Sequence, residues 1–269
     1  MNPLIDTAQE ITTAIGTAQS EHNPRKWFVA YSGGSDSAVV LQALIELGLY
    51  ERFNMQTMTI DTGLGSAGHI ERVTNDVMQA TGEPPLVYKG EGLDWYEGNV
   101  RNFGFGYRIT HHAPYYQYLK RKAIEACVRE NKEHRLDRIA FLTGVRRSES
   151  IYRAKRPILQ RNGSRLTVNA IVTLTDTDKI PYLNRATWYH GKTTHDCLCN
   201  WHARFTLDDL KGTDAHPRLC QLSQEMIEAG MWGYGEEPSE NWMIDDSTGD
   251  EMDADSLCID CMRQLRLDM

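Results

Sequence analysis

Between a strand-like and a helix-like segment lies a glycine-rich hexapeptide, Ser32-Gly33-Gly34-Ser35-Asp36-Ser37. Residues 27–31, WFVAY, are apolar, aromatic and β-branched, which is typical of a buried strand. Apolar residues recur at helical spacing over residues 39–47, and Gly48 ends that pattern. We therefore predict a strand, a tight loop and a helix, with backbone N–H groups of the loop turned toward one point.

This loop has the chemistry of a phosphate-binding site. Its N–H groups and the positive end of the following helix attract an anion, and Ser32, Ser35 and Ser37 add hydroxyl donors. The loop lacks the GK[ST] ending of a Walker A motif and the spacing of the dinucleotide motif GxGxxG. A plain strand-to-helix turn is the alternative, because Gly and Ser are common there.

Strand-like and helix-like segments go on alternating along the chain. Strands are predicted at 55–60, 86–90, 138–144 and 165–174, and helices at about 66–81 and 114–131. Such alternation predicts an α/β fold, a doubly wound and mainly parallel sheet with right-handed crossovers. The carboxyl ends of its strands would carry Ser32, Asp61 and Gly144, which is where such sheets bind ligands.

The chain divides into three expected parts. Residues 1–24 form an N-terminal helix, residues 25–185 a nucleotide-binding domain, and residues 186–269 an irregular Cys-rich region that binds a metal or cluster. Within the second part, residues 91–113 are rich in Gly and aromatics and have no clean period. We predict a loop or insertion there.

Charge and hydropathy exclude several protein classes. The 269 residues carry 37 acids and 29 bases, a net charge of −8, which argues against a general nucleic-acid binder. No apolar run reaches the roughly 18 residues of a membrane span, and the first residues do not resemble a secretory signal. We therefore expect a cytoplasmic protein.

The cysteines form a second constellation. Five of the six lie in the last third of the chain: Cys197, Cys199, Cys220, Cys258 and Cys261. Two close pairs about sixty residues apart can complete a four-thiolate site, for which zinc and a [4Fe–4S] cluster are both suitable. His195 and His202 are alternative zinc ligands. Cys127 lies on a predicted apolar helix face and is interpreted as a buried free thiol.

The complete hexapeptide resembles the SGGxDS signature of the PP-loop ATP pyrophosphatases, the adenine nucleotide alpha hydrolase-like superfamily. Further motifs resemble its phosphoadenosine phosphosulfate (PAPS) reductase-like branch. These are residues 59–63 (TIDTG), residues 144–150 (GVRRSES) with Arg153, and a stretch from Val168 to Asp178. The resemblance covers about residues 25–185. Ala170 and Leu174 depart from the Pro and Trp of the family pattern.

The resemblance implies a nucleotide site. The pyrophosphate of ATP would lie in the Ser32–Ser37 loop, the adenine near Thr59, Ile60 and Asp61, and the phosphates near Gly144, Arg146 and Arg147. Arginine forks suit phosphate or sulfate oxygens, although surface ion pairing is the alternative for any one of them. Asp36 would bind Mg²⁺ through water or sit in the first helical turn for capping. Asp36, Arg146 and Arg153 are the candidate catalytic residues.

The resemblance also favours iron. Several PAPS reductase-like proteins carry a [4Fe–4S] cluster held by a close Cys pair and a distal CxxC, here Cys258 and Cys261. The close pair is a CxC in this chain, so the fourth ligand is Cys197 or Cys220.

Three functions follow as hypotheses. The first is an enzyme that adenylates its substrate with ATP and carries a cluster, in sulfur transfer or nucleic-acid modification, with a protein donor of sulfur or electrons. The second is PAPS or adenylylsulfate reduction, for which the C-terminal motif with the nucleophilic Cys is missing. The third is a non-catalytic nucleotide-binding subunit with structural zinc.

A basic aromatic segment, residues 95–122, is a candidate surface for a single-stranded nucleic acid. Its members are Trp95, Arg101, Arg108, His111, His112, Tyr115, Tyr116, Lys120, Arg121 and Lys122. An amphipathic helix with its loop is the alternative interpretation.

Overall fold

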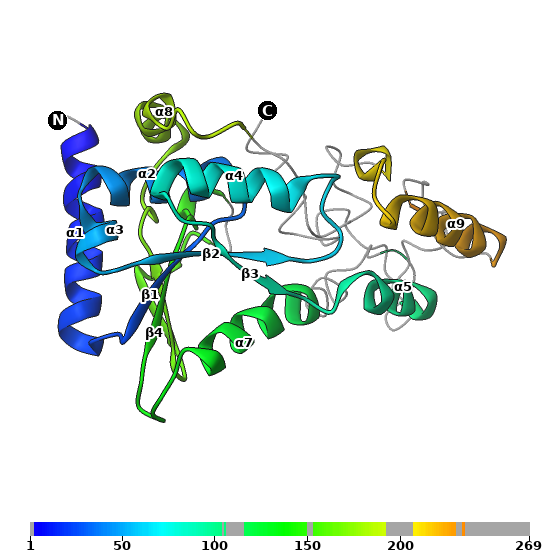
Figure 1. Ribbon diagram of the computed structural model, residues 1–269, viewed down its shortest axis with the longest axis horizontal. Helices are drawn as coiled ribbons and strands as arrows, with labels where there is room; N and C mark the ends of the chain where they lie inside the picture. Colours follow the sequence, from blue (N-terminus) through cyan, green and yellow to red (C-terminus); the bar gives the residue numbers. More distant parts are fainter. Residues whose placement is uncertain are drawn as a thin grey trace, which may run out of the picture. The chain divides into compact units, whose positions relative to one another are not determined.

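A computed structural model describes residues 3–103, 105, 116–149, 153–191, 207–229 and 233–234. The chain forms two compact units, and each is assembled from three separate stretches (Figure 1). The first unit comprises residues 1–60, 68–88 and 124–193, and the second comprises residues 61–67, 89–123 and 194–269.

The sheet has six strands in the order β3-β2-β1-β4-β6-β5. Their bounds are β1 Lys26–Ala30, β2 Gln56–Asp61, β3 Leu86–Lys89, β4 Ile139–Thr143, β5 Leu159–Asn162 and β6 Arg165–Asn169. β1 pairs in parallel with β2 and β4, and β4 pairs in parallel with β6, whereas the edge strand β5 runs antiparallel to β6. The predicted α/β fold with a mainly parallel sheet is confirmed.

Helices cover both faces of this sheet, as a doubly wound fold requires. In β1 the side chains of Trp27 and Val29 join one apolar cluster, and that of Phe28 joins another. The first cluster draws residues from α1 (Pro3–His22), α2 (Ser35–Glu46), α3 (Leu49–Arg52), α4 (His69–Thr81) and α8 (Asp176–Arg185). α7 (Lys122–Glu130) lies on the other side of the strands from α2 and α4 (Figure 1), and it contributes Cys127 to the second cluster.

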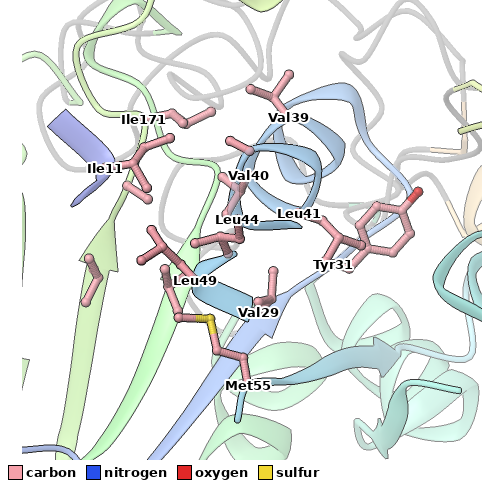
Figure 2. Packing of buried hydrophobic residues seen from close by; sticks show 14 of the residues in the cluster. Ile11, Val29, Tyr31, Val39, Val40, Leu41, Leu44, Leu49, Met55 and Ile171 are labelled. Atoms are coloured by element: carbon pink, nitrogen blue, oxygen red, sulfur yellow. The ribbon is translucent and has the colours of Figure 1, made fainter. Parts of the chain in front are cut away.

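The centre of the first cluster is the buried face of α2. Val40, Leu41 and Leu44 are at most 1% exposed, and they pack with Val29 of β1 and Ile11 of α1 (Figure 2). Burying aliphatic side chains of this size stabilises the fold by about 2 kcal/mol each. The core therefore fixes the start of α2 against the end of β1.

The second unit has an apolar cluster of its own. Helix α5 (Gly92–Phe103) contributes Tyr96 and Val100, and helix α9 (Ala215–Glu228) contributes Leu219 and Leu222. Outside the cluster, Arg218 of α9 pairs with two carboxylates of α5. A π-helix, η1 (Tyr116–Arg121), and two 3₁₀ turns, η2 (Arg147–Glu149) and η3 (Leu207–Leu210), complete the described elements.

Two expectations about local structure change. Residues 91–113 were expected to be a loop or an insertion, and the loop alternative is wrong for residues 92–103, where α5 forms because Tyr96 and Val100, four residues apart, bury one face of a helix. The strand expected at 165–174 ends at Asn169. The apolar residues that follow form a buried turn, in which Val172 N–H donates to the Asn169 carbonyl at 3.3 Å.

Among the described residues, no helix is both long enough and apolar enough to cross a membrane.

Candidate nucleotide site

The predicted loop lies at the carboxyl end of β1, beside the point where the sheet reverses its strand order. Chain connections lead from β1 to β2 and β3 on one side, while β4, β6 and β5 lie on the other. Open α/β sheets bind ligands at such a switch point, outside the carboxyl ends of the strands. Both the Ser32–Ser37 loop and Gly144, which follows β4, flank it.

The loop is shaped by glycine and by one serine. Gly33 has φ +74°, a left-handed conformation that favours glycine. Gly34 is the N-cap of α2 and makes no side-chain capping bond, so the first N–H groups of the helix have no capping side chain. Ser37 Oγ donates to the Gly34 carbonyl at 2.8 Å and accepts from Ser32 N–H at 3.3 Å. These two hydrogen bonds tie the end of the loop, at Ser37, to its beginning.

Gly144 packs against the first turn of α2. A Cβ atom at this position would lie 2.7 Å from the Asp36 carbonyl carbon and 2.9 Å from the Ser37 nitrogen. Both neighbours are backbone atoms, so they cannot move aside as the end of a side chain would. The absence of a side chain at Gly144 therefore lets β4 approach the loop closely.

A four-residue charge network adjoins the loop. Asp36 Oδ1 is 3.1 Å from Arg146 Nε and 2.7 Å from Lys179 Nζ. The same two cations hold Asp176 Oδ1, at 3.0 Å from Arg146 and 2.9 Å from Lys179. Two acids and two bases cancel in formal charge. Asp36 is thus paired with two cations in this structure.

The predicted arginines occupy different places. Arg146 is 5% exposed and faces Asp36. Arg147 is exposed, and its Nε donates to the Arg156 carbonyl at 2.9 Å. Arg153 lies in the turn before β5, where its carbonyl accepts from Arg156 N–H. Among the contacts that the structure describes, Arg146 is the one of these three arginines that pairs with a loop residue.

Sequence reasoning missed Lys179 and Asp176, both on α8. The available signal was a capping box: Thr175 N–H donates to Asp178 Oδ2 at 2.8 Å, and the Thr175 side chain caps the third residue of the helix. A Thr followed three residues later by an acid predicts a helix start. A helix beginning there brings Lys179, one turn later, toward Asp36.

The end of β2 carries a buried hydroxyl without a partner. Thr59 is 2% exposed, and its Oγ1 has no hydrogen-bond partner in the described part of the chain. Such a group costs about 1–3 kcal/mol unless something satisfies it. Ile60 packs into the apolar cluster with Tyr88. Asp61 Oδ1 accepts from Gly63 N–H at 2.9 Å, which forms a local turn.

A buried hydrogen-bond chain begins at Tyr31, the residue before the loop. Tyr31 Oη donates to Asp76 Oδ2 at 2.8 Å, and Asp76 Oδ1 is 2.7 Å from His190 Nδ1. Tyr31 is 1% exposed and Asp76 is 3% exposed. Burial, with the nearby Asp76 carboxylate, raises the pKa of Tyr31 far above its ordinary value. Burial and the charges of Asp76 and Asp36 raise the pKa of Tyr189 to about 12.

We expect the free energy of unfolding to fall as pH rises above about 10. In the unfolded chain the tyrosines ionise near that pH, whereas the raised pKa of Tyr31 and Tyr189 keeps them protonated in the fold. The folded state then binds more protons than the unfolded state, so stability decreases with pH. Urea unfolding at a series of alkaline pH values measures this. The decrease should be less steep in Tyr31→Phe; equal steepness would contradict the assignment.

The described cysteines differ in accessibility. Cys127 is buried, and burial raises the pKa of its thiol to about 11, as expected of an inert core cysteine. Cys220 is exposed on α9, with its Sγ 3.7 Å from His216 Nε2. Within the described ranges no three His, Cys, Asp or Glu side chains form a metal-binding group. The other predicted ligands lie outside the described residues: Cys197, Cys199, Cys258, Cys261, His195 and His202.

The described part of the basic aromatic segment is largely paired within its own unit. Arg101 pairs with Glu225, and Lys122 pairs with Glu91. The ring of Tyr118 stacks on Trp95 at 4.6 Å between centroids, and Lys122 Nζ lies 4.3 Å from its centroid. Arg108, His111, His112 and Tyr115 lie outside the described residues.

Comparison with known proteins decides the family. The phosphoadenosine phosphosulfate reductase domain matches residues 26–188, which is more than half of the chain. The chain belongs to this family. The predicted resemblance to the PAPS reductase-like branch of the PP-loop proteins is thereby confirmed. The domain spans all six strands of the sheet, the Ser32–Ser37 loop and helix α8. A comparison with curated proteins finds no match.

Several solved structures are similar to this PAPS reductase domain protein at low identity. A PAPS reductase from Candida auris in complex with phosphate is 15% identical, with 71% of this chain and 81% of that one covered and a TM-score of 0.45. An FMN adenylyltransferase from Candida glabrata with FAD and inorganic pyrophosphate is 13% identical, covering 66% and 56%, with a TM-score of 0.43. The U34-tRNA thiolase NcsA from Methanococcus maripaludis, with its [4Fe–4S] cluster, is 12% identical, covering 83% and 73%, with a TM-score of 0.43.

Proposed function

We propose that this PAPS reductase domain protein is an enzyme that binds ATP or a related adenine nucleotide at the Ser32–Ser37 loop. One observation carries the proposal: two buried cations, Arg146 and Lys179, converge on Asp36 in the loop, where the first N–H groups of α2 also have no capping side chain. Together they provide donors and positive charge for several phosphate oxygens. The orphaned hydroxyl of Thr59 is a candidate contact for the nucleoside.

The chemistry we propose is cleavage between the α- and β-phosphates. An oxygen of the acceptor attacks the α-phosphorus, the bond from this phosphorus to the bridging oxygen breaks, and pyrophosphate leaves with the electron pair. The loop amides, Arg146 and Lys179 would stabilise the charge that develops on the leaving group. Mg²⁺ would neutralise phosphate charge when bound, and Asp36 is the residue whose carboxylate could hold it.

The experiment that tests the proposal is ATP binding by calorimetry, followed by detection of AMP and pyrophosphate. We expect binding in the wild type and at least tenfold weaker binding in Gly33→Ala, because φ +74° is strained for alanine and the loop must change shape. Release of sulfite from PAPS in the presence of a thiol reductant would instead indicate sulfonucleotide reduction.

The matched control is Gly163→Ala. Gly163 also has a left-handed backbone, with φ +61°, but it lies in the turn between β5 and β6 and has no atom within 4 Å of an added Cβ. We expect this variant to lose a similar backbone energy, about 1 kcal/mol, and to bind ATP like the wild type. Absence of ATP binding in the wild type, or equal loss in both variants, would contradict the proposal.

We further propose that the Cys-rich region holds a [4Fe–4S] cluster, with ligands from Cys197, Cys199, Cys220, Cys258 and Cys261. The exposed thiol of Cys220, next to His216, supports a role for this side chain outside the core. A cluster could serve sulfur transfer, with a partner protein that supplies sulfur or electrons. A nucleic-acid acceptor has less support, because Arg101 and Lys122 already pair with carboxylates.

Anaerobic purification followed by iron, sulfide and zinc analysis tests the cluster. We expect about four iron and four sulfide per chain, lost in Cys258→Ser and retained in Cys127→Ala. Cys127 is the suitable control because it is buried in the sheet core, among Phe28 and Phe141. Zinc at about one per chain without iron would instead select a structural zinc site.

A further inference from the structure

The four-residue charge network beside the loop is unequal in exposure. The side chains of Arg146 and Lys179 are 6% and 10% exposed, and that of Asp36 is 21% exposed. The side chain of Asp176, by contrast, is 74% exposed. The two cations and Asp36 are therefore largely buried, whereas Asp176 contacts the cations from the solvent side.

The cations keep their positions through contacts that do not involve Asp176. Arg146 is held by Asp36 and by Ser148, whose Oγ accepts from Arg146 Nη1 at 3.0 Å. Ser148 in turn donates to the Leu174 carbonyl at 3.1 Å. Lys179 is held by Asp36 at 2.7 Å. Donors fixed in this way are preorganised for an anion.

The exposed carboxylate of Asp176 contacts Arg146 and Lys179 as a bound anion would. A single oxygen, Asp176 Oδ1, lies 3.0 Å from Arg146 Nη2 and 2.9 Å from Lys179 Nζ. The hydrogen bond from Lys179, with the charge of Arg146, holds the pKa of the Asp176 carboxyl below its ordinary value. Among the contacts that the structure describes, loss of Asp176 would take from the two buried cations one of the two carboxylates that they share, which favours uptake of another anion.

We propose that Asp176 is an internal competitor for the nucleotide: its carboxylate occupies the place on Arg146 and Lys179 that a phosphate oxygen of the nucleotide takes. Binding of the nucleotide displaces the carboxylate into solvent, and its two cation contacts pass to the phosphate. The inference rests on the proposed function, and it adds that the protein's own carboxylate must leave the phosphate position before the nucleotide binds. It also assigns Lys179 as a phosphate ligand.

The test compares Asp176→Asn with Asp178→Asn in calorimetric titrations with Mg²⁺ and AMPCPP, an ATP analogue that is not cleaved between the α- and β-phosphates. Both substitutions remove one negative charge from the first turn of α8, but Asp178 bonds to Thr175, not to the cations. We expect about tenfold tighter binding in Asp176→Asn and a change within about twofold in Asp178→Asn. Lys179→Met should bind at least tenfold more weakly.

The possible results separate the two proposals. Unchanged or weaker binding in Asp176→Asn, with clear binding by the wild type and loss in Lys179→Met, would overturn the competitor role while the proposed function stands. No binding by the wild type would overturn both. The thermal unfolding midpoint of each variant is measured alongside, so that a change in binding is separated from a loss of folded protein.

Discussion

Gly144→Ala is expected to destabilise the protein by about 3 kcal/mol and to abolish nucleotide binding. The added methyl group would meet the Asp36 carbonyl carbon at 2.7 Å and the Ser37 nitrogen at 2.9 Å. Relief requires the first turn of α2 to move away from β4, and that turn forms the loop. Urea unfolding and ATP titration measure the two effects.

The control for this substitution is Gly16→Ala, in helix α1. No atom lies within 4 Å of an added Cβ at Gly16, so alanine should stabilise the helix by about 0.5–1 kcal/mol. If Gly16→Ala raises the free energy of unfolding and Gly144→Ala lowers it, the loss at Gly144 comes from steric overlap of the added methyl group. A difference in backbone flexibility between glycine and alanine would not give opposite signs. An unfolding midpoint of Gly144→Ala equal to that of the wild type would refute the close packing.

Asp76→Ala is expected to cost about 3 kcal/mol of unfolding free energy. The substitution leaves the Tyr31 hydroxyl, which is buried in the core, without its acceptor, and it removes the carboxylate that bonds to His190. An unmade hydrogen bond at a buried group costs more than the bond itself contributes.

A double-mutant cycle with Tyr31→Phe isolates the Tyr31–Asp76 bond. Because phenylalanine has no hydroxyl to satisfy, Asp76→Ala should cost less in the Tyr31→Phe background, with a coupling of about 1 kcal/mol or more. Strictly additive losses would show that the two side chains do not depend on each other.

The sequence predicted the centre of the fold well, because central strands are buried on both faces. β1 and β4 appear as short apolar runs, and the strands expected at β1, β2 and β4 each overlap the observed one. β5 could not be recognised in this way. Residues 159–162, LQRN, lie at the sheet edge with mostly exposed side chains, so no apolar period marks them.

The loop was predictable, but its counter-charges were not. Ser32–Ser37 is a contiguous pattern, whereas Lys179 reaches Asp36 across 143 positions of sequence only because α8 begins at Asp176 and packs beside α2. A lysine on an expected surface is ordinarily solvated. Lys179 is 8% exposed because α8 packs against α2, and the residues near Lys179 in the sequence do not reveal this packing.

The interleaving of the two units limits what deletion experiments can say. A protein cut after residue 193 would retain the six strands that the structure describes, yet it would lose α9 and with it Leu219 and Leu222. Leu64, Tyr96 and Val100, which belong to earlier stretches of the chain, would then lose the helix against which they cluster. Aggregation or loss of activity in the truncated protein could therefore result from exposure of this apolar core, and it would not by itself show that the proposed metal centre had been removed. Single cysteine substitutions are the sounder route to the role of the C-terminal region.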